Sequence, residues 1–405
     1  MVRRSTRSSR TGLPQARLLC NADKDILLSC GVDPASLEYL VPKLHHVNLL
    51  VKDVKLYAAN ILKQSMLSIG GDAAVHKHVI SGKVDVSDCV IMGDMRHYKL
   101  LLDKLKLQPG LEQLAACISE QVFPESCPLN LSLCGNLMEW EELPVVMGIL
   151  NVTPDSFSDG GKYNHPGRAL DHAIKLVAQG AEIIDVGGES SRPGSMGVSA
   201  DEEISRTIPI IRELSTSSNI PVSIDTTKAR VARAALLAGA TIINDISALR
   251  ADPEMMGLAR ESGCGVILMH MRGTPNTMQE DTYYEDIVGE IYAFLAGRVE
   301  ACLEAGILRK SLIIDPGIGF GKDMQGNLSI LNHIAEFKSI HLPLMVGHSR
   351  KSFIGKILES DADQREEGTD AITSWATLNG VDMVRVHNCL HAKRVRSMIR
   401  SVMGA

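Results

Sequence analysis

From residue 145 onward, short apolar runs alternate with longer segments in which apolar residues recur at helical spacing. Short Val/Ile/Leu-rich runs bounded by Gly, Pro or polar residues are typical of buried strands, and their alternation with helices predicts βα units around a parallel sheet. The eight runs are VVMGILNV (145–152), AEIIDVG (181–187), PVSIDT (221–226), TIINDIS (241–247), GVILMHM (265–271), SLIIDPG (311–317), PLMVGHS (343–349) and MVRVHN (383–388). Eight such units in about 260 residues predict an α/β fold of the (β/α)8 TIM-barrel type.

A doubly wound open sheet is the alternative arrangement of alternating strands and helices. It is less favoured because no G-x-G-x-x-G motif follows the first run. Helices are expected at 165–179 and 228–238, since Gly180 and Gly239 stand just past their last periodic residues, where helix C-termini prefer glycine.

The chain before residue 145 has a different pattern. Strands are predicted at 45–54 and 86–94, and each is followed by a helical segment, the first closed by Gly70 and Gly71. Two strands and two helices in this order indicate a small α+β domain. We therefore expect four parts, which are a disordered basic tail (1–19), the small domain (20–125), a linker (126–143) and the TIM barrel (144–405).

Composition restricts the class of protein. The 405 residues are 45% hydrophobic and 22% charged, with a formal net charge of -6, which argues against a nucleic-acid-binding surface. No apolar stretch is long enough to cross a bilayer. Nine cysteines without a C-x-x-C pair indicate reduced, buried thiols. We expect a cytoplasmic protein with no membrane partner and no nucleic-acid partner.

Polar side chains end all eight predicted strands. In a TIM barrel these ends converge on one rim, where βα loops form the active site, whereas isolated polar residues merely cap helices. The residues at these ends are Asn151, Glu189, Asp225, Asn244, His270, Asp315, Ser349 and His387.

Three groups on this rim indicate a chemistry. Cations gather after the last two strands, at Arg350, Lys351, Arg385 and His387, and Arg192 adds a guanidinium to the second loop, which together suit a phosphorylated ligand. The acceptors and donors of Asp225, Asn244 and Asp315 suit a flat heterocycle with an N–C–N edge. Asn151 offers a neutral oxygen, which is adequate for Mg2+ that also binds a diphosphate.

The motifs NVTPDSFSDGG and GESSRPG closely match two signatures of the dihydropteroate synthase family. The resemblance continues, in the family's order, through SIDT, INDIS, LMHMRGTPNTMQ, DPGIGFGK, GHSRKSFIG and RVHN. It covers the chain from residue 145 to the C-terminus. One departure is Ser191, where the family commonly has threonine.

The resemblance implies a transferase of folate biosynthesis that joins 6-hydroxymethyl-7,8-dihydropterin diphosphate to 4-aminobenzoate, giving 7,8-dihydropteroate and diphosphate. Asp225, Asn244, Asp315 and Lys351 would hold the pterin. Asn151, Arg385 and His387 would face the diphosphate with Mg2+. Ser191, Arg192 and Ser349 would form the aminobenzoate site. The family also implies a homodimer formed through barrel helices.

Two other functions stay open at this point. A corrinoid-dependent methyltransferase acting on a methylated folate has a similar barrel and pterin pocket, but it has no use for a cationic diphosphate site. A pterin-binding protein without catalytic activity is the other alternative.

Overall fold

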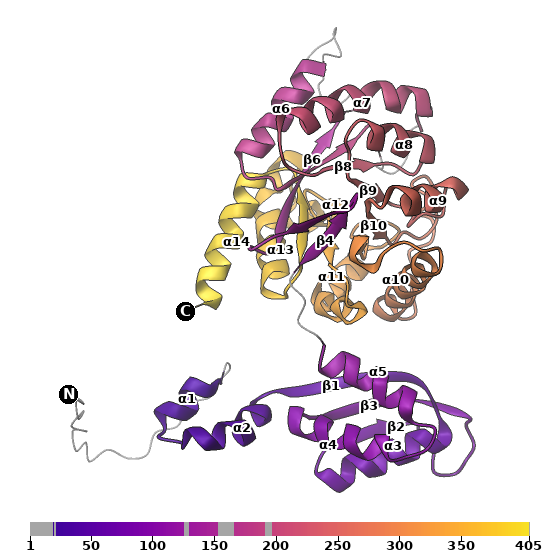
Figure 1. Ribbon diagram of the computed structural model, residues 1–405, viewed down its shortest axis with the longest axis vertical. Coiled ribbons are helices and arrows are strands. Elements are labelled where there is room, and N and C mark those ends of the chain that lie inside the picture. The colour runs from indigo at the N-terminus through magenta and orange to yellow at the C-terminus, as the bar shows by residue number, and fades with distance from the viewer. Residues whose placement is uncertain (1–18, 20–21, 125–128, 153–165, 191–196, 405) are drawn as a thin grey trace, which may run out of the picture. The chain divides into compact units, whose positions relative to one another are not determined.

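A computed structural model describes residues 19, 22–124, 129–152, 166–190 and 197–404 (Figure 1). The chain divides into two units, Met1–Ser126 and Cys127–Ala405. The expected tail at 1–19 and the expected loop that follows the first barrel strand lie almost wholly outside the described residues. None of the described helices is both long enough and apolar enough to cross a membrane.

The second unit is a parallel barrel with helices on its outside (Figure 1). In the described part of this unit the eight barrel strands are β6 (Val145–Asn151), β7 (Ile183–Gly187), β8 (Val222–Asp225), β9 (Ile242–Asp245), β10 (Gly265–Met269), β11 (Leu312–Asp315), β12 (Met345–Val346) and β13 (Met383–Val386). The sheet order is β11-β10-β9-β8-β7-β6-β13-β12, and a bridge from Ile314 to Leu344 closes the ring. The predicted TIM barrel is confirmed.

Helices follow the strands and cover the barrel. Within the described residues they are α6 (Pro166–Ala178), α7 (Ala200–Ser217), α8 (Ala229–Leu237), α9 (Pro253–Ser262), α10 (Ile287–Glu304), α11 (Met324–Asn332), α12 (Ser352–Leu358), α13 (Glu366–Leu378) and α14 (Cys389–Met403). Gly180 and Gly239 follow α6 and α8 with φ of 98° and 109°, so both predicted helix ends are confirmed to within about two residues.

A hairpin closes the amino-terminal end of the barrel. Its strands are β4 (Asn130–Leu133) and β5 (Asn136–Glu139), joined by Cys134 and Gly135, which both have positive φ. Leu131 and Leu133 are 0% and 1% exposed. They pack with the lowest layer of inward-facing barrel residues, which includes Met147, Ile183, Ile242, Ile267, Ile313, Met345 and Met383.

The hairpin differs from the linker expected over 126–143. Its pattern is NLSL-CG-NLME, in which leucines alternate with polar residues around a turn that requires left-handed backbone. Contact with the barrel is close, because a Cβ at Gly265, the first residue of β10, would lie 2.6 Å from Leu133 Cδ2. The segment is therefore part of the barrel core.

The first unit contains an antiparallel sheet in the order β1-β3-β2, formed by β1 (His46–Lys55), β2 (Asp72–Val75) and β3 (Val86–Asp94). Three helices contact this sheet, α3 (Leu56–Ile69), α4 (Met95–Lys106) and α5 (Glu112–Val122). Two short helices precede it, α1 (Lys24–Ser29) and α2 (Leu37–Leu40). Both predicted strand–helix pairs are present, and β2 and α5 were not predicted.

Candidate active site

A cavity opens at the carboxyl ends of the barrel strands. It encloses about 340 Å³ when its open mouth is included. Its lining residues are Asp225, Asn244, Ile246, Met269, Asp315, Gly317, Ile318, Phe320, Met345, Gly347, Lys351 and Arg385. Five of the residues predicted from the sequence, Asp225, Asn244, Asp315, Lys351 and Arg385, thus share one cavity.

The acidic residues of the cavity have unusual proton affinities. Burial raises the pKa of Asp225 to about 7, against the opposing effect of the nearby Arg385 charge. Burial also raises the pKa of Asp315 to about 6, although the backbone N–H of Gly317 donates to its Oδ1 at 2.7 Å. Perturbed carboxyl groups in a cleft are typical of a functional site.

Arg385 lies between two carboxylates. Its Nε donates to Asp185 Oδ2 at 2.6 Å and its Nη2 donates to Asp225 Oδ2 at 2.7 Å. Asn244 Nδ2 also donates to Asp185 Oδ2, at 3.0 Å. One guanidinium therefore bridges the fully buried Asp185 and the partly buried Asp225 and fixes the orientation of both.

Asp185 was missed by the sequence analysis, which assigned Glu189 to the second strand end. Its side chain is fully buried, and its Oδ1 has no hydrogen-bond partner among the described residues. A signal was present, because an acid inside the apolar run AEIIDVG must have a buried partner. Asp185 also lies two residues after Ile183, which faces the inside of the barrel, so Asp185 faces the same side.

Lys351 reaches the cavity from the start of α12. Its Nζ lies 4.0 Å from the centre of the Phe320 ring, a cation–π contact. Burial, together with the Arg385 charge, lowers the pKa of Lys351 to about 8. Lys351 thus presents a cation to a ligand bound between the loops that follow β11 and β12.

The remaining predicted residues lie beside this cavity or outside the described residues. Ser349 Oγ and His387 Nδ1 are 2.9 Å apart, and the His387 backbone N–H donates to the same Oγ. A Cβ placed on Gly187 would lie 3.7 Å from both Asn151 Oδ1 and Asp225 Oδ2, so the Asn151 side chain faces the same barrel mouth as Asp225. Ser191 and Arg192 lie outside the described residues.

The residues just before Ser191 and Arg192 are anchored to α7 and to the start of α8. Lys228 Nζ lies 2.5 Å from Glu189 Oε2 and 2.7 Å from Glu203 Oε2, and Arg206 Nη1 donates to Gly188 O at 2.8 Å. Glu189 therefore forms an ion pair in this anchor and does not line the cavity described above.

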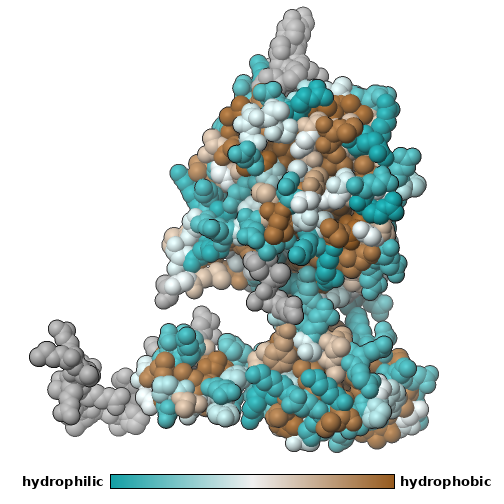
Figure 2. Space-filling view, viewed as in Figure 1, coloured by the Kyte–Doolittle hydropathy of each residue, from teal (hydrophilic) through white to brown (hydrophobic). Residues whose placement is uncertain are grey.

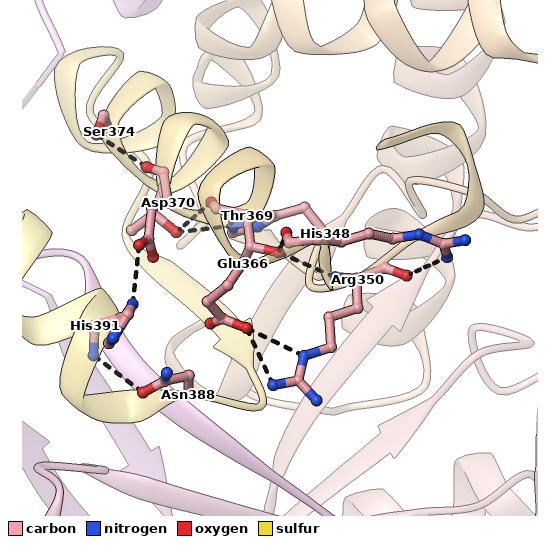
Figure 3. Close-up of polar contacts among 10 residues, drawn as sticks. His348, Arg350, Glu366, Thr369, Asp370, Ser374, Asn388 and His391 are labelled. Atoms are coloured by element: carbon pink, nitrogen blue, oxygen red, sulfur yellow. Dashed lines mark hydrogen bonds and ion pairs between the residues drawn. The ribbon is translucent and has the colours of Figure 1, made fainter. Parts of the chain in front are cut away.

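Arg350 and His270, two other rim residues, have structural partners. Figure 3 shows Arg350 directed toward Glu366, whose Oε2 accepts from its Nε and Nη2 at 3.1 Å. His270 is 6% exposed, and its Nδ1 lies 3.0 Å from Lys322 Nζ. Burial and neighbouring cations lower the pKa of His270 to about 2, so its ring is neutral.

An acidic cluster lies near Arg350, formed by Glu366, Asp370 and His391 (Figure 3). One possible ligand atom from each lies within 4.8 Å of the others. However, Glu366 Oε2 is bonded to Arg350, and Asp370 Oδ2 lies 3.0 Å from His391 Nδ1. The Arg350–Glu366 ion pair and the Asp370–His391 hydrogen bond account for the cluster, and they join α13 to the rim and to α14.

Comparison with known proteins agrees with this geometry. Residues 147–387 match the family model described as "Pterin binding enzyme". The dihydropteroate synthase of Synechocystis sp. is 47% identical over 267 residues, which are 66% of this chain and 91% of that relative. The structure of Xanthomonas albilineans dihydropteroate synthase with 4-aminobenzoic acid superposes with a TM-score of 0.65 and 37% identity, covering 69% of this chain and all of that one.

One relative extends beyond the barrel. A probable bifunctional folylpolyglutamate synthase/dihydropteroate synthase of Haloferax volcanii is 39% identical over 341 residues, which are 82% of this chain and 40% of that relative. Because the second unit begins only at residue 127, an alignment of this extent includes part of the first unit. The first unit is therefore not peculiar to this chain.

Proposed function

The chain belongs to the dihydropteroate synthase family of pterin-binding enzymes, and on this premise we propose how its residues handle the two substrates. Its function is to condense 6-hydroxymethyl-7,8-dihydropterin diphosphate with 4-aminobenzoate, giving 7,8-dihydropteroate and diphosphate. The observation that carries the assignment is the single cavity in which Asp225, Asn244 and Asp315 lie beside Lys351 and Arg385.

The pterin is assigned to the deepest part of this cavity. Asp225 and Asp315 would accept hydrogen bonds from its ring N–H and amino groups, and Asn244 and Lys351 would donate to its acceptors. Asp185 does not line the cavity, but it accepts from Arg385 and Asn244, which both do, so it would orient these two side chains toward the pterin.

The diphosphate is assigned to the rim above the pterin, near Asn151, Arg385 and His387. Asn151 offers an amide oxygen of the kind that Mg2+ accepts, and it faces the same mouth as Asp225. Mg2+ would supply electrostatic stabilisation of the departing diphosphate. Ser191, Arg192 and Ser349 are assigned to the aminobenzoate, and Ser349 is already held near the rim by His387.

The reaction needs no nucleophile from the enzyme. The amine nitrogen of 4-aminobenzoate forms a bond to the methylene carbon of the pterin, the carbon–oxygen bond to diphosphate breaks, and the amine loses a proton. Positive charge grows on the pterin as the bond to diphosphate breaks, and the carboxylate of Asp225 would stabilise it. His387 and Arg385 would stabilise the negative charge on the leaving group.

The test of this proposal is incubation with the pterin diphosphate, Mg2+ and a panel of arylamines, with products identified by mass. We expect 7,8-dihydropteroate and one diphosphate per turnover with 4-aminobenzoate. Tight binding of the pterin without release of diphosphate would contradict the proposal and favour a non-catalytic pterin-binding protein.

The raised carboxyl pKa values predict opposite effects of pH on binding and stability. As pH falls through about 7 and then about 6, Asp225 and Asp315 take up protons and lose their ability to accept from the pterin, so kcat/KM for the pterin will fall. In the free protein, the effect of pH on folding stability has the opposite sign. A carboxyl whose pKa is raised by folding stabilises the folded state below its unfolded pKa, and this contribution is lost as pH rises from about 4 to about 7.

Thermal unfolding of the free protein and of Asp225→Asn between pH 4 and 8 will check the second effect. We expect the thermal midpoint of Asp225→Asn to rise relative to that of the wild type as pH rises. A difference between the two proteins that does not vary with pH would contradict this prediction.

We also propose a homodimer, in a cytoplasmic setting. Large apolar side chains are exposed on the last helices of the barrel, including Ile357 and Leu358 on α12, Trp375 and Leu378 on α13, and Met398 on α14. On the face in Figure 2, hydrophobic and hydrophilic residues of the barrel unit are interspersed. Light scattering of the purified protein will check the proposal, and a monomer at micromolar concentration would contradict it.

A further inference from the structure

The loop between β11 and α11 is wound around one buried lysine. Lys322 Nζ lies 2.8 Å from Phe320 O, 2.9 Å from Gly317 O, and 3.3 Å from His270 O. It also lies 3.0 Å from His270 Nδ1, and the lysine is only 3% exposed. An ammonium group has three donors, so these buried acceptors use its full capacity.

This loop forms one wall of the cavity. Gly317, Ile318 and Phe320 all line it. The backbone is left-handed at Gly317, and a Cβ there would lie 2.0 Å from His270 O. The loop is thus pressed against the end of β10, with buried carbonyl groups that Lys322 satisfies. Without that ammonium, Phe320 O and His270 O would lose the donor described here, and Gly317 O would keep only the Phe320 backbone N–H, at 3.1 Å.

The same wall supports Lys351. The Lys351 ammonium lies over the Phe320 ring, and a Cβ at Gly319 would be 3.1 Å from Lys351 Cδ. The position of Lys351 therefore depends on the path of the backbone through Gly319 and Phe320. Lys322 itself is not among the residues that line the cavity, so it can act on a ligand there only through this loop or through its charge.

We propose that Lys322 is a positioning residue for pterin recognition. It holds the turn from Gly317 to Phe320 in place, and through that turn it sets the Phe320 ring and the Lys351 ammonium against the bound pterin. The inference rests on the proposed function, since it assumes that the pterin occupies the cavity.

Charge adds a second route from Lys322 to the pterin. The groups that face Lys322 are Asp315 at the end of β11, His270 and Arg272 after β10, and Lys351 after β12. Burial, the main cause, lowers the pKa of Lys322 to about 7, while Asp315 opposes this shift. The positive charges of Lys351, Lys322 and Arg385 in turn favour ionised Asp315. Removing the Lys322 charge will therefore make Asp315 easier to protonate.

The test compares the wild type with Lys322→Met, whose side chain is unbranched, one atom shorter and uncharged. We expect the Kd of the pterin diphosphate, measured by calorimetry without arylamine, and its KM to rise by about tenfold or more. At saturating pterin, kcat and the arylamine KM should both stay within about threefold of the wild-type values. The acid limb of kcat/KM for the pterin should move to higher pH, because Asp315 has lost a cationic neighbour.

Two controls separate positioning from general loss of stability. Leu129 belongs to the barrel floor, the cluster in which Leu129, Leu131 and Leu133 pack against the lowest inward-facing barrel residues at the end opposite the cavity. Leu129→Ala should lower the thermal midpoint without changing the pterin KM. Lys356→Met removes an exposed lysine of α12 and should change neither quantity. Lys322→Gln keeps N–H donors for the carbonyl groups but has no charge. If Lys322→Met does not fold, the pterin KM and pH profile of Lys322→Gln test the positioning role instead. We expect it to show the full pH shift with a smaller rise in KM.

The inference is overturned if both Lys322 variants bind the pterin diphosphate within twofold of the wild type, or if Leu129→Ala raises the pterin KM equally. Failure of the proposed function is distinguishable from either outcome, since it would appear as a wild-type protein that forms no dihydropteroate.

Discussion

Replacing Arg385 with alanine will lower kcat by about 100- to 1,000-fold, the usual loss when one charge-stabilising donor is removed from an active site. The structure adds a second effect that the sequence did not suggest. Arg385 bonds both Asp185 and Asp225, so its loss leaves one fully buried and one partly buried carboxylate without their cation. We therefore expect the free energy of unfolding near neutral pH to fall by about 3 kcal/mol as well.

The conservative variant separates the two effects. Arg385→Lys keeps a positive charge but has no planar fork with which to bridge two carboxylates. It should recover much of the stability and little of the turnover. Arg309→Ala, which removes an arginine that donates to Ile340 O away from the cavity, is the matched control and should leave kcat unchanged. Near-wild-type turnover in Arg385→Ala would remove Arg385 from its assigned role.

The periodicity of the sequence was sufficient for the barrel. Short apolar runs alternate with helical segments, and both features are local, so the eight strands and the two helices expected at 165–179 and 228–238 could be placed to within a few residues. Convergence of the rim could also be predicted, because the topology of a parallel barrel brings Asp225, Asn244 and Asp315 to one end.

Pairings between distant residues could not be predicted in this way. Arg385 binds Asp185, which is 200 residues away, and Lys322 binds His270, which is 52 residues away. The sequence also did not reveal which rim cation faces the cavity. Lys351 lines the cavity, whereas its neighbour Arg350 has φ of 56° and pairs with Glu366 (Figure 3). That difference depends on the local backbone and on α13, and neither can be read from the motif SRK.

The hairpin below the barrel was missed for a related reason. Its strands are short, and their leucines have no core of their own to enter. Their burial depends on a floor that exists only after eight strands have closed into a ring. The boundary between the two units therefore matters for experiment. A chain that starts at residue 144 loses the floor, whereas one that starts at residue 127 keeps it.

The floor predicts the largest effects on stability. Leu131→Ala and Leu133→Ala should each lower the free energy of unfolding of the barrel unit by about 2 to 5 kcal/mol, as is usual for fully buried leucines. Leu137→Ala, in the same hairpin but 52% exposed, is the matched control and should change it by no more than about 0.5 kcal/mol. Denaturant titrations followed by circular dichroism will give the three values.

Truncation tests the same point without a substitution. A chain that begins at residue 127 should unfold with the same midpoint as the barrel unit of the full protein and retain synthase activity. A chain that begins at residue 144 should be destabilised by more than either leucine substitution, because it exposes the lowest barrel layer from Met147 to Met383. Equal stability of the two truncated chains would show that the barrel floor closes without the hairpin.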